Sequence, residues 1–162
     1  MAFRGIIVED PSHVPALKGI GEALIAQAYE YLTETINRNA VDNCRDAVAY
    51  LVQAAAVRPD VACIWKLLGE ALTLIHPLPS DLVEFEVPGK LLSNDSTNAA
   101  VLGKGDLLRL GAKCYIRSLQ LANDNPECWH DLAISYDAQA SVSLDERESK
   151  QLKEKAMAAI KK

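Results

Sequence analysis

The sequence predicts an all-α fold, a right-handed superhelical solenoid of antiparallel helix pairs that one long insertion interrupts. Ala and Leu dominate its 162 residues, of which 49% are hydrophobic and only 6% aromatic, a balance that favours helices over a β-sandwich. One apolar pattern also recurs three times at helical spacing, and the segments between its copies end in proline. We therefore expect stacked helix pairs around a continuous core.

The recurring pattern is clearest between residues 17–24 and 65–72, where five of eight aligned positions are identical, and a weaker copy in phase lies at 129–136. Each copy has a large apolar residue, Ile or Leu three positions on, Gly or Ala four on, and Leu or Tyr seven on. These offsets place all four on one helical face, and the small residue is expected to let a neighbouring helix approach. The predicted packing residues are Leu17, Ile20, Gly21, Leu24, Trp65, Leu68, Gly69, Leu72, Trp129, Leu132, Ala133 and Tyr136.

The three openings resemble the W-x2-L-G-x2-Y start of the tetratricopeptide repeat, and residues 47–59 and 111–126 resemble its second helix with the terminal proline. Solenoids need polar caps at both ends, and no obvious cap is seen at either end of this sequence. The resemblance therefore implies a piece of a longer array. The predicted units are 1–12 (tail of a preceding repeat), 13–60, 61–126 and 127–162. The expected helices are 13–37, 41–58, 61–75, 106–123, 127–141 and 145–161, with the first break at Asn37-Arg38-Asn39.

The insertion, residues 76–105, is rich in proline and glycine but carries seven large apolar residues between Leu78 and Leu92, too many for a free linker. We expect a mostly extended segment that packs back on the helices without forming a β-sheet. Residues 82–92 should be ordered, with Phe85 or Val87 buried against a helix of this chain or against a partner. The sequence Asn94-Asp95-Ser96 matches a glycosylation acceptor, which we expect to be unused without a secretory route.

Polar residues one step off the apolar stripe are the candidate partner-binding residues. In tetratricopeptide arrays this face of the first helix lines the concave groove, so the resemblance implies a polar groove that accepts a partner segment. The alternative interpretation is surface Lys–Glu pairs at i,i+4, worth roughly a few tenths of a kcal/mol each. The candidates and their counterparts in the third copy are Lys18, Glu22, Lys66, Glu70, His130 and Ile134.

Neither the charge nor the motifs of the sequence indicate a catalytic residue, a metal ligand or a bound cofactor. The formal charge of −5 argues against binding nucleic acid through a basic surface. No nucleotide-binding, nucleophile or metal motif is present, and none of the four cysteines has CxxC spacing, so we expect buried reduced thiols at Cys44, Cys63, Cys114 and Cys128. No apolar run reaches the roughly 20 residues of a membrane span, and no secretory leader is visible.

A narrower resemblance connects the chain with the metazoan tetratricopeptide-repeat subunits of the Ski (superkiller) complex. It implies a non-catalytic scaffold, located in the cytoplasm with the nucleus as a second compartment, that holds an RNA helicase and WD40-repeat subunits. That assembly assists the RNA exosome in 3′-to-5′ mRNA decay, and the scaffold itself is not expected to bind RNA tightly. The segments that carry this resemblance are 15–24, 65–71, 107–115 and 128–136.

The alternative function is a chaperone adaptor that binds the tails of Hsp70 or Hsp90. Such a clamp needs Lys, Asn and Arg side chains converging on a terminal carboxylate. Lys18 suits that task, but Glu22, Glu70 and Asp131 place acids where the anion would lie.

Overall fold

The computed structural model describes residues 2–93 and 97–162, so the Asn94-Asp95-Ser96 acceptor lies outside the described residues. The longer helices are α1 (Ala2–Glu9), α2 (Val14–Thr33), α3 (Asn37–Val57), α4 (Ala62–Thr73), α6 (Lys104–Leu121), α7 (Pro126–Val142) and α8 (Glu146–Ile160). The insertion contains a 3-10 turn, η1 (Ser80–Leu82), strand β1 (Glu84–Val87), the short helix α5 (Gly89–Leu92) and strand β2 (Ala100–Gly103).

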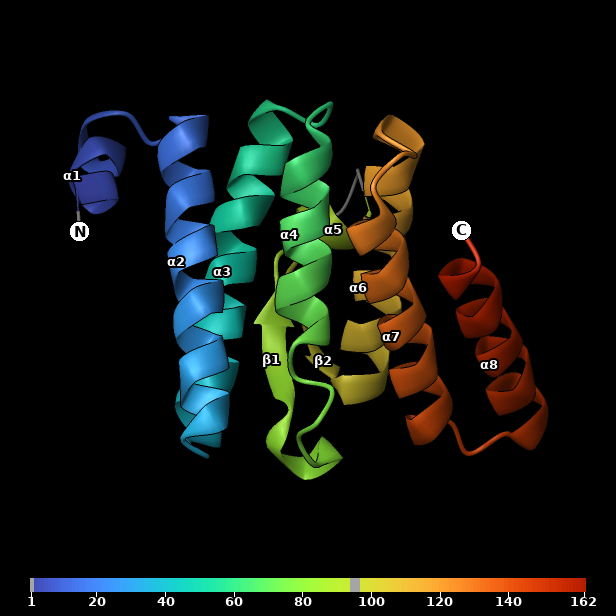
Figure 1. Cartoon of the computed structure of the whole chain (residues 1–162). Coiled ribbons are helices and arrows are strands. Elements are labelled where there is room, and N and C mark those ends of the chain that lie inside the picture. The colour runs from blue at the N-terminus through green and yellow to red at the C-terminus, as the bar shows by residue number, and fades with distance from the viewer. Residues whose placement is uncertain (1, 94–96) are drawn as a thin grey trace.

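The helices form an all-α solenoid, as the repeat pattern predicted. Helix α2 packs on α3, α4 on α6, and α7 on α8, while contacts of α3 with α4 and of α6 with α7 join successive pairs. Figure 1 shows these helices side by side, with α1 at one end of the row and α8 at the other. The insertion connects α4 to α6, the two helices of the middle pair.

The repeat-packing residues lie at the contacts between helices. Nine of the twelve are buried, while Trp65, Trp129 and Tyr136 are half-buried. Each tryptophan indole donates a hydrogen bond to the carbonyl six residues earlier, Trp65 to Pro59 at 2.9 Å and Trp129 to Asn123 at 3.1 Å. The first residue of these two openings therefore also fixes the loop that precedes its own helix.

Helices α4 and α6 pack closely at Gly69 and Gly111. A Cβ atom at Gly69 would lie 2.7 Å from the ring of Tyr115 on α6. A Cβ atom at Gly111 would lie 2.8 Å from Thr73 Oγ1 and 3.3 Å from the Gly69 carbonyl oxygen. Within the described part of the chain, the buried Thr73 hydroxyl has no hydrogen-bond partner. The small residue of the repeat pattern thus serves close backbone approach in this pair.

The insertion forms a two-stranded sheet, so the expectation of a chain without a sheet is wrong. Strands β1 and β2 pair antiparallel, with Phe85 opposite Leu102 and Val87 opposite Ala100. Along β1 exposed and buried residues alternate, and Phe85 (5% exposed) and Val87 (0%) join the main core beside α3. A four-residue strand has too short an alternation to be recognised, and its partner lies beyond α5 in the sequence.

The first interhelical break lies earlier than predicted, because Asn37-Arg38-Asn39 begins α3 instead of separating two helices. The turn is at Thr35, whose φ of 59° is left-handed. The N–H of Ile36 donates to the Tyr31 carbonyl at 2.8 Å, and that of Thr35 donates to the Leu32 carbonyl at 3.2 Å. This is the Schellman pattern, in which glycine is the usual residue, so a threonine there gives no sequence signal.

Thr35→Gly is expected to raise the free energy of unfolding by about 0.5–1 kcal/mol, since a β-branched residue is strained at positive φ and glycine is not. Chemical denaturation of the chain measures the change. The matched control is Thr33→Gly in the last turn of α2, which should lower stability by a similar amount. A loss of stability in Thr35→Gly would show that the turn is not left-handed in solution.

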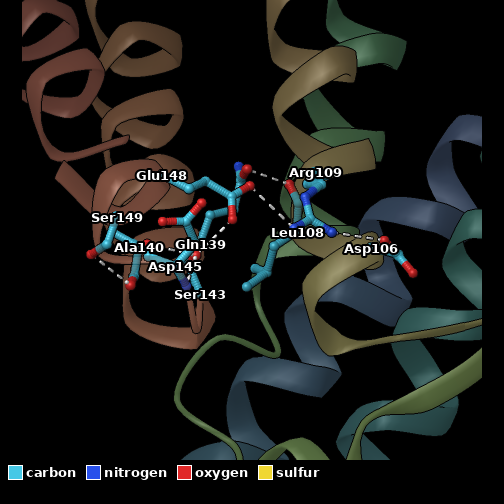
Figure 2. Close-up of polar contacts among 9 residues, drawn as sticks. All are labelled: Asp106, Leu108, Arg109, Gln139, Ala140, Ser143, Asp145, Glu148 and Ser149. Atoms are coloured by element: carbon cyan, nitrogen blue, oxygen red, sulfur yellow. Dashed lines mark hydrogen bonds and ion pairs between the residues drawn. The ribbon is translucent and has the colours of Figure 1, made fainter. Parts of the chain in front are cut away.

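Polar contacts tie the third helix pair to the second, and Figure 2 shows several of them near the start of α6 and the connection from α7 to α8. The side chains of Ser135 and Gln139 both donate to the Leu108 carbonyl, at 3.1 and 3.3 Å. Arg109 of α6 bonds Glu148 of α8 at 3.3 Å. The Ser143 hydroxyl donates to Glu148 at 2.6 Å, which lowers the pKa of that carboxyl with help from Arg109. These contacts orient α7 and α8 relative to α6.

The cysteines are less uniformly buried than expected. Cys44, Cys114 and Cys128 are buried, whereas Cys63, in the first turn of α4, is exposed. Burial raises the pKa of the Cys44 and Cys114 thiols to about 12, so both stay protonated at neutral pH. None of the described helices is both long and apolar enough to cross a bilayer.

Candidate functional site

The candidate site is a groove on the side of the array formed by α2, α4 and α7. Its first hollow, of about 410 Å³, has walls from these three helices and a floor that includes Tyr115 of α6. A second hollow, of about 590 Å³, continues toward α8. Both hollows are lined by His76, Pro77 and Ile134, so they lie next to each other. The remaining lining residues of the first hollow are Tyr29, Leu32, Thr33, Glu70, Thr73, Leu74 and Asp131.

Lys66 joins α4 to α7 beside this groove. Its Nζ lies 3.3 Å from a Glu127 carboxylate oxygen and 3.7 Å from one of Asp131. The alternative interpretation, a surface pair of Lys66 with Glu70, is therefore wrong, since α7 brings two better-placed carboxylates to the same lysine. Although burial lowers it, the pKa of Lys66 is raised overall by Glu127, Asp131 and Glu70.

Glu70 and Asp131 are half-buried carboxylates of the first hollow. The Tyr29 hydroxyl on α2 donates to Glu70 at 3.4 Å. Burial raises the pKa of Glu70 and outweighs the opposing effect of Lys66, and the charge of Asp131 adds to the rise. Burial likewise raises the pKa of Asp131, against Lys66 and with help from Glu127. Burial and these carboxylates also raise the pKa of Tyr29 to about 12.

The raised pKa of Glu70 predicts that its charge costs stability in the free protein. Such a group stabilises the fold below its ordinary pKa of 4.5, and this contribution is lost as pH rises through the folded-state value. We expect Glu70→Gln to raise the unfolding free energy at pH 7, with the difference shrinking below pH 4.5. Denaturation at both pH values measures this. Glu22→Gln, which only removes an exposed pair, is the control, and a destabilised Glu70→Gln would contradict the prediction.

The structure places some of the other predicted partner-binding residues in the groove and some elsewhere. Lys18 and Glu22 form the expected i,i+4 pair at 2.8 Å, on α2 but outside both hollows. His130 lines the second hollow, and Ile134 lines both. Phe85 and Val87 are buried in this chain's own core, which gives them a packing role instead of a place on a free surface.

Tyr29 lines the groove and Glu127 adjoins it through Lys66, and the sequence reasoning missed both. Tyr29 follows Lys18 by eleven residues, close to three helical turns, so extending that register along α2 would have found it. Glu127 carried no comparable signal, because its role depends on α7 packing beside α4. Among the described residues, no three His, Cys, Asp or Glu side chains gather closely enough to hold a metal ion.

The helix pairs, the repeat-packing residues and the groove together define the class of protein: the chain is an all-α solenoid of tetratricopeptide-type helix pairs. No protein family model matches it. Over 99% of its length it is 35% identical to tetratricopeptide repeat protein 37 of Xenopus laevis, and 36% and 35% identical to superkiller complex protein 3 of Mus musculus and Homo sapiens. The chain therefore resembles a segment of the tetratricopeptide-repeat subunit of the superkiller complex, and it spans about 10% of the length of these relatives.

Proposed function

We propose that the chain is a non-catalytic protein-interaction segment of a superkiller-complex scaffold. The observation that carries this proposal is the groove, which three helices of the repeat array line together. The similarity to superkiller complex protein 3 across 99% of the chain supports the assignment to that complex. A rigid array that presents a groove needs no reactive group, and the protonated thiols of Cys44 and Cys114 are poor nucleophiles.

The proposed partners are the RNA helicase and WD40-repeat subunits of the complex, and the proposed role is assistance to the RNA exosome in 3′-to-5′ mRNA decay. We place the protein in the cytoplasm, with the nucleus as a second compartment. The net charge of −5 and the carboxylates of the groove support a role in which other subunits contact the RNA.

The rival function, an adaptor for chaperone tails, receives little support from the groove. A tail carboxylate needs cationic side chains that are free to bind it. Lys66 already contacts Glu127 and Asp131, and Glu70 lies one turn further along α4. Lys18 is paired with Glu22 and lies outside both hollows.

Affinity purification of the full-length protein from cells tests the proposed function. We expect an RNA helicase and WD40-repeat proteins to be recovered, and Hsp70 or Hsp90 in their place would support the chaperone adaptor. In parallel, the purified chain should show no micromolar, sequence-independent RNA affinity at physiological salt. Such an affinity would contradict the proposal that other subunits contact the RNA.

A further inference from the structure

The charge of the groove is unbalanced at the first hollow. Glu70, Asp131 and the adjoining Glu127 supply three carboxylates, and Lys66 supplies one ammonium group. In the described part of the chain Glu70 has no ion pair, and its polar contact is the Tyr29 hydroxyl at 3.4 Å. Lys66 offsets only part of the cost of burying this carboxylate, and an incoming cation would remove much of the rest.

The walls of the first hollow are apolar, which restricts the shape of that cation. Leu32, Leu74, Pro77 and Ile134 line it beside the acids. Lysine and arginine match such a surface, since an aliphatic stem can cover apolar walls while the charged end reaches a carboxylate. A phosphate backbone or a terminal carboxylate would instead meet charges of its own sign.

The character of the groove changes toward α8. The second hollow is lined by Ala133, Met157 and Ile160, and by the cations Lys104 and Lys153. Lys104 donates to the Leu78 carbonyl at 2.6 Å, and Asp137 is the acid that lines this end. A uniformly basic segment would be repelled here, so the groove suits a segment with a basic residue at one end and apolar residues at the other.

We propose that this groove docks a protein segment that seats a lysine or arginine between Glu70 and Asp131 and lays apolar side chains along α7 and α8. This inference rests on the proposed function, because it names the partner chemistry of the same groove. Binding supplies a second cation beside the one that Lys66 already provides, and the change of sign along the groove sets the direction in which the segment lies. Tyr29, at the rim of the first hollow, contacts the bound basic residue or its neighbours.

Site-specific photo-crosslinking in the assembled complex tests this inference. The full-length protein is expressed in cells with p-benzoylphenylalanine at Tyr29, and at Val101 on the exposed face of the hairpin as the control position. The complex is then purified, and the crosslinked segments are sequenced by mass spectrometry. We expect Tyr29 crosslinks to map to a segment with a lysine or arginine beside apolar residues, and Val101 crosslinks not to map there.

Charge reversal separates docking chemistry from mere proximity. Glu70→Lys should lower the Tyr29 crosslink yield at least tenfold, whereas Glu22→Lys, on α2 outside both hollows, should leave it within twofold. Changing the partner's basic residue to glutamate should restore the yield in Glu70→Lys. If Glu70→Lys does not fold, Glu70→Gln keeps the side-chain shape and should lower the yield about threefold.

An acidic or uncharged crosslinked segment, or a yield that Glu70→Lys and Glu70→Gln leave unchanged, would overturn the inference. So would the absence of Tyr29 crosslinks from a complex that is otherwise recovered intact. In each of these cases the recovered subunits would still support the scaffold function. Failure to recover any subunit with the unmodified protein would count against the proposed function itself.

Discussion

Gly69→Leu is expected to lower the free energy of unfolding by about 1–3 kcal/mol through overpacking. Even the first added carbon would lie 2.7 Å from the Tyr115 ring, and Tyr115 is only 2% exposed and cannot easily move aside. The change therefore forces α4 and α6 apart, against a contact in which the Gly111 and Gly69 backbones also meet. Urea denaturation followed by circular dichroism measures the loss.

The matched control for Gly69→Leu is Gly5→Leu, the same exchange in a helix where an added Cβ meets no atom within 4 Å. We expect this control to keep the stability of the parent chain or to raise it slightly, because leucine has the higher helix propensity. If Gly69→Leu left the denaturation midpoint unchanged as well, α6 would not pack at Gly69 in solution. The middle helix pair would then need another arrangement.

Phe85→Ala is expected to cost about 3–5 kcal/mol, the range for removing a buried aromatic side chain. Phe85 is 5% exposed and belongs to the main core, on the face of the hairpin that contacts α3. Its loss would leave a cavity between the insertion and the array, and thermal unfolding of the chain should report it as a lower midpoint.

The opposite face of the hairpin supplies the control for Phe85→Ala. Val101 on β2 is 58% exposed, so Val101→Ala should change stability by about 0.5 kcal/mol or less. Hydrogen exchange provides a second readout, in which amides of β1 and β2 should be protected in the chain alone. Free exchange in the chain, together with an unaffected Phe85→Ala, would mean that the hairpin is ordered only by a partner.

These contacts bear on function because a groove keeps its shape only while the helices behind it keep their spacing. The glycine contact of α4 with α6 positions Glu70, and the polar contacts of Leu108 and Arg109 orient α7, which carries Asp131. A variant that disturbs either contact should therefore weaken the groove as well as the fold. The stability measurements are thus needed alongside every binding measurement on groove variants.

The sequence by itself determined the helix pairs and the residues that pack them. The apolar stripe of a helix is a local pattern that repeats every three or four residues. When the chain is aligned with itself, this pattern occurs in three copies, which makes it easier to recognise. The fold class and Gly69 as a packing position followed from that pattern, and the resemblance to tetratricopeptide arrays implied the groove-facing places of Glu70 and Ile134. The resemblance to superkiller subunits likewise needed only residues in register, and relatives of that name are similar over 99% of the chain.

Only the tertiary structure decided which charges meet. Lys66 could reach Glu70 within its own helix, but the approach of α7 offered Glu127 and Asp131, and no local pattern ranks a partner about 60 residues away. The same reason hid the β1–β2 pairing and the burial of Phe85, which depend on what the helices place beside the insertion. The first break between helices was predicted too late in the sequence. The turn is at Thr35, where the surrounding contacts hold a threonine in a conformation that usually requires glycine.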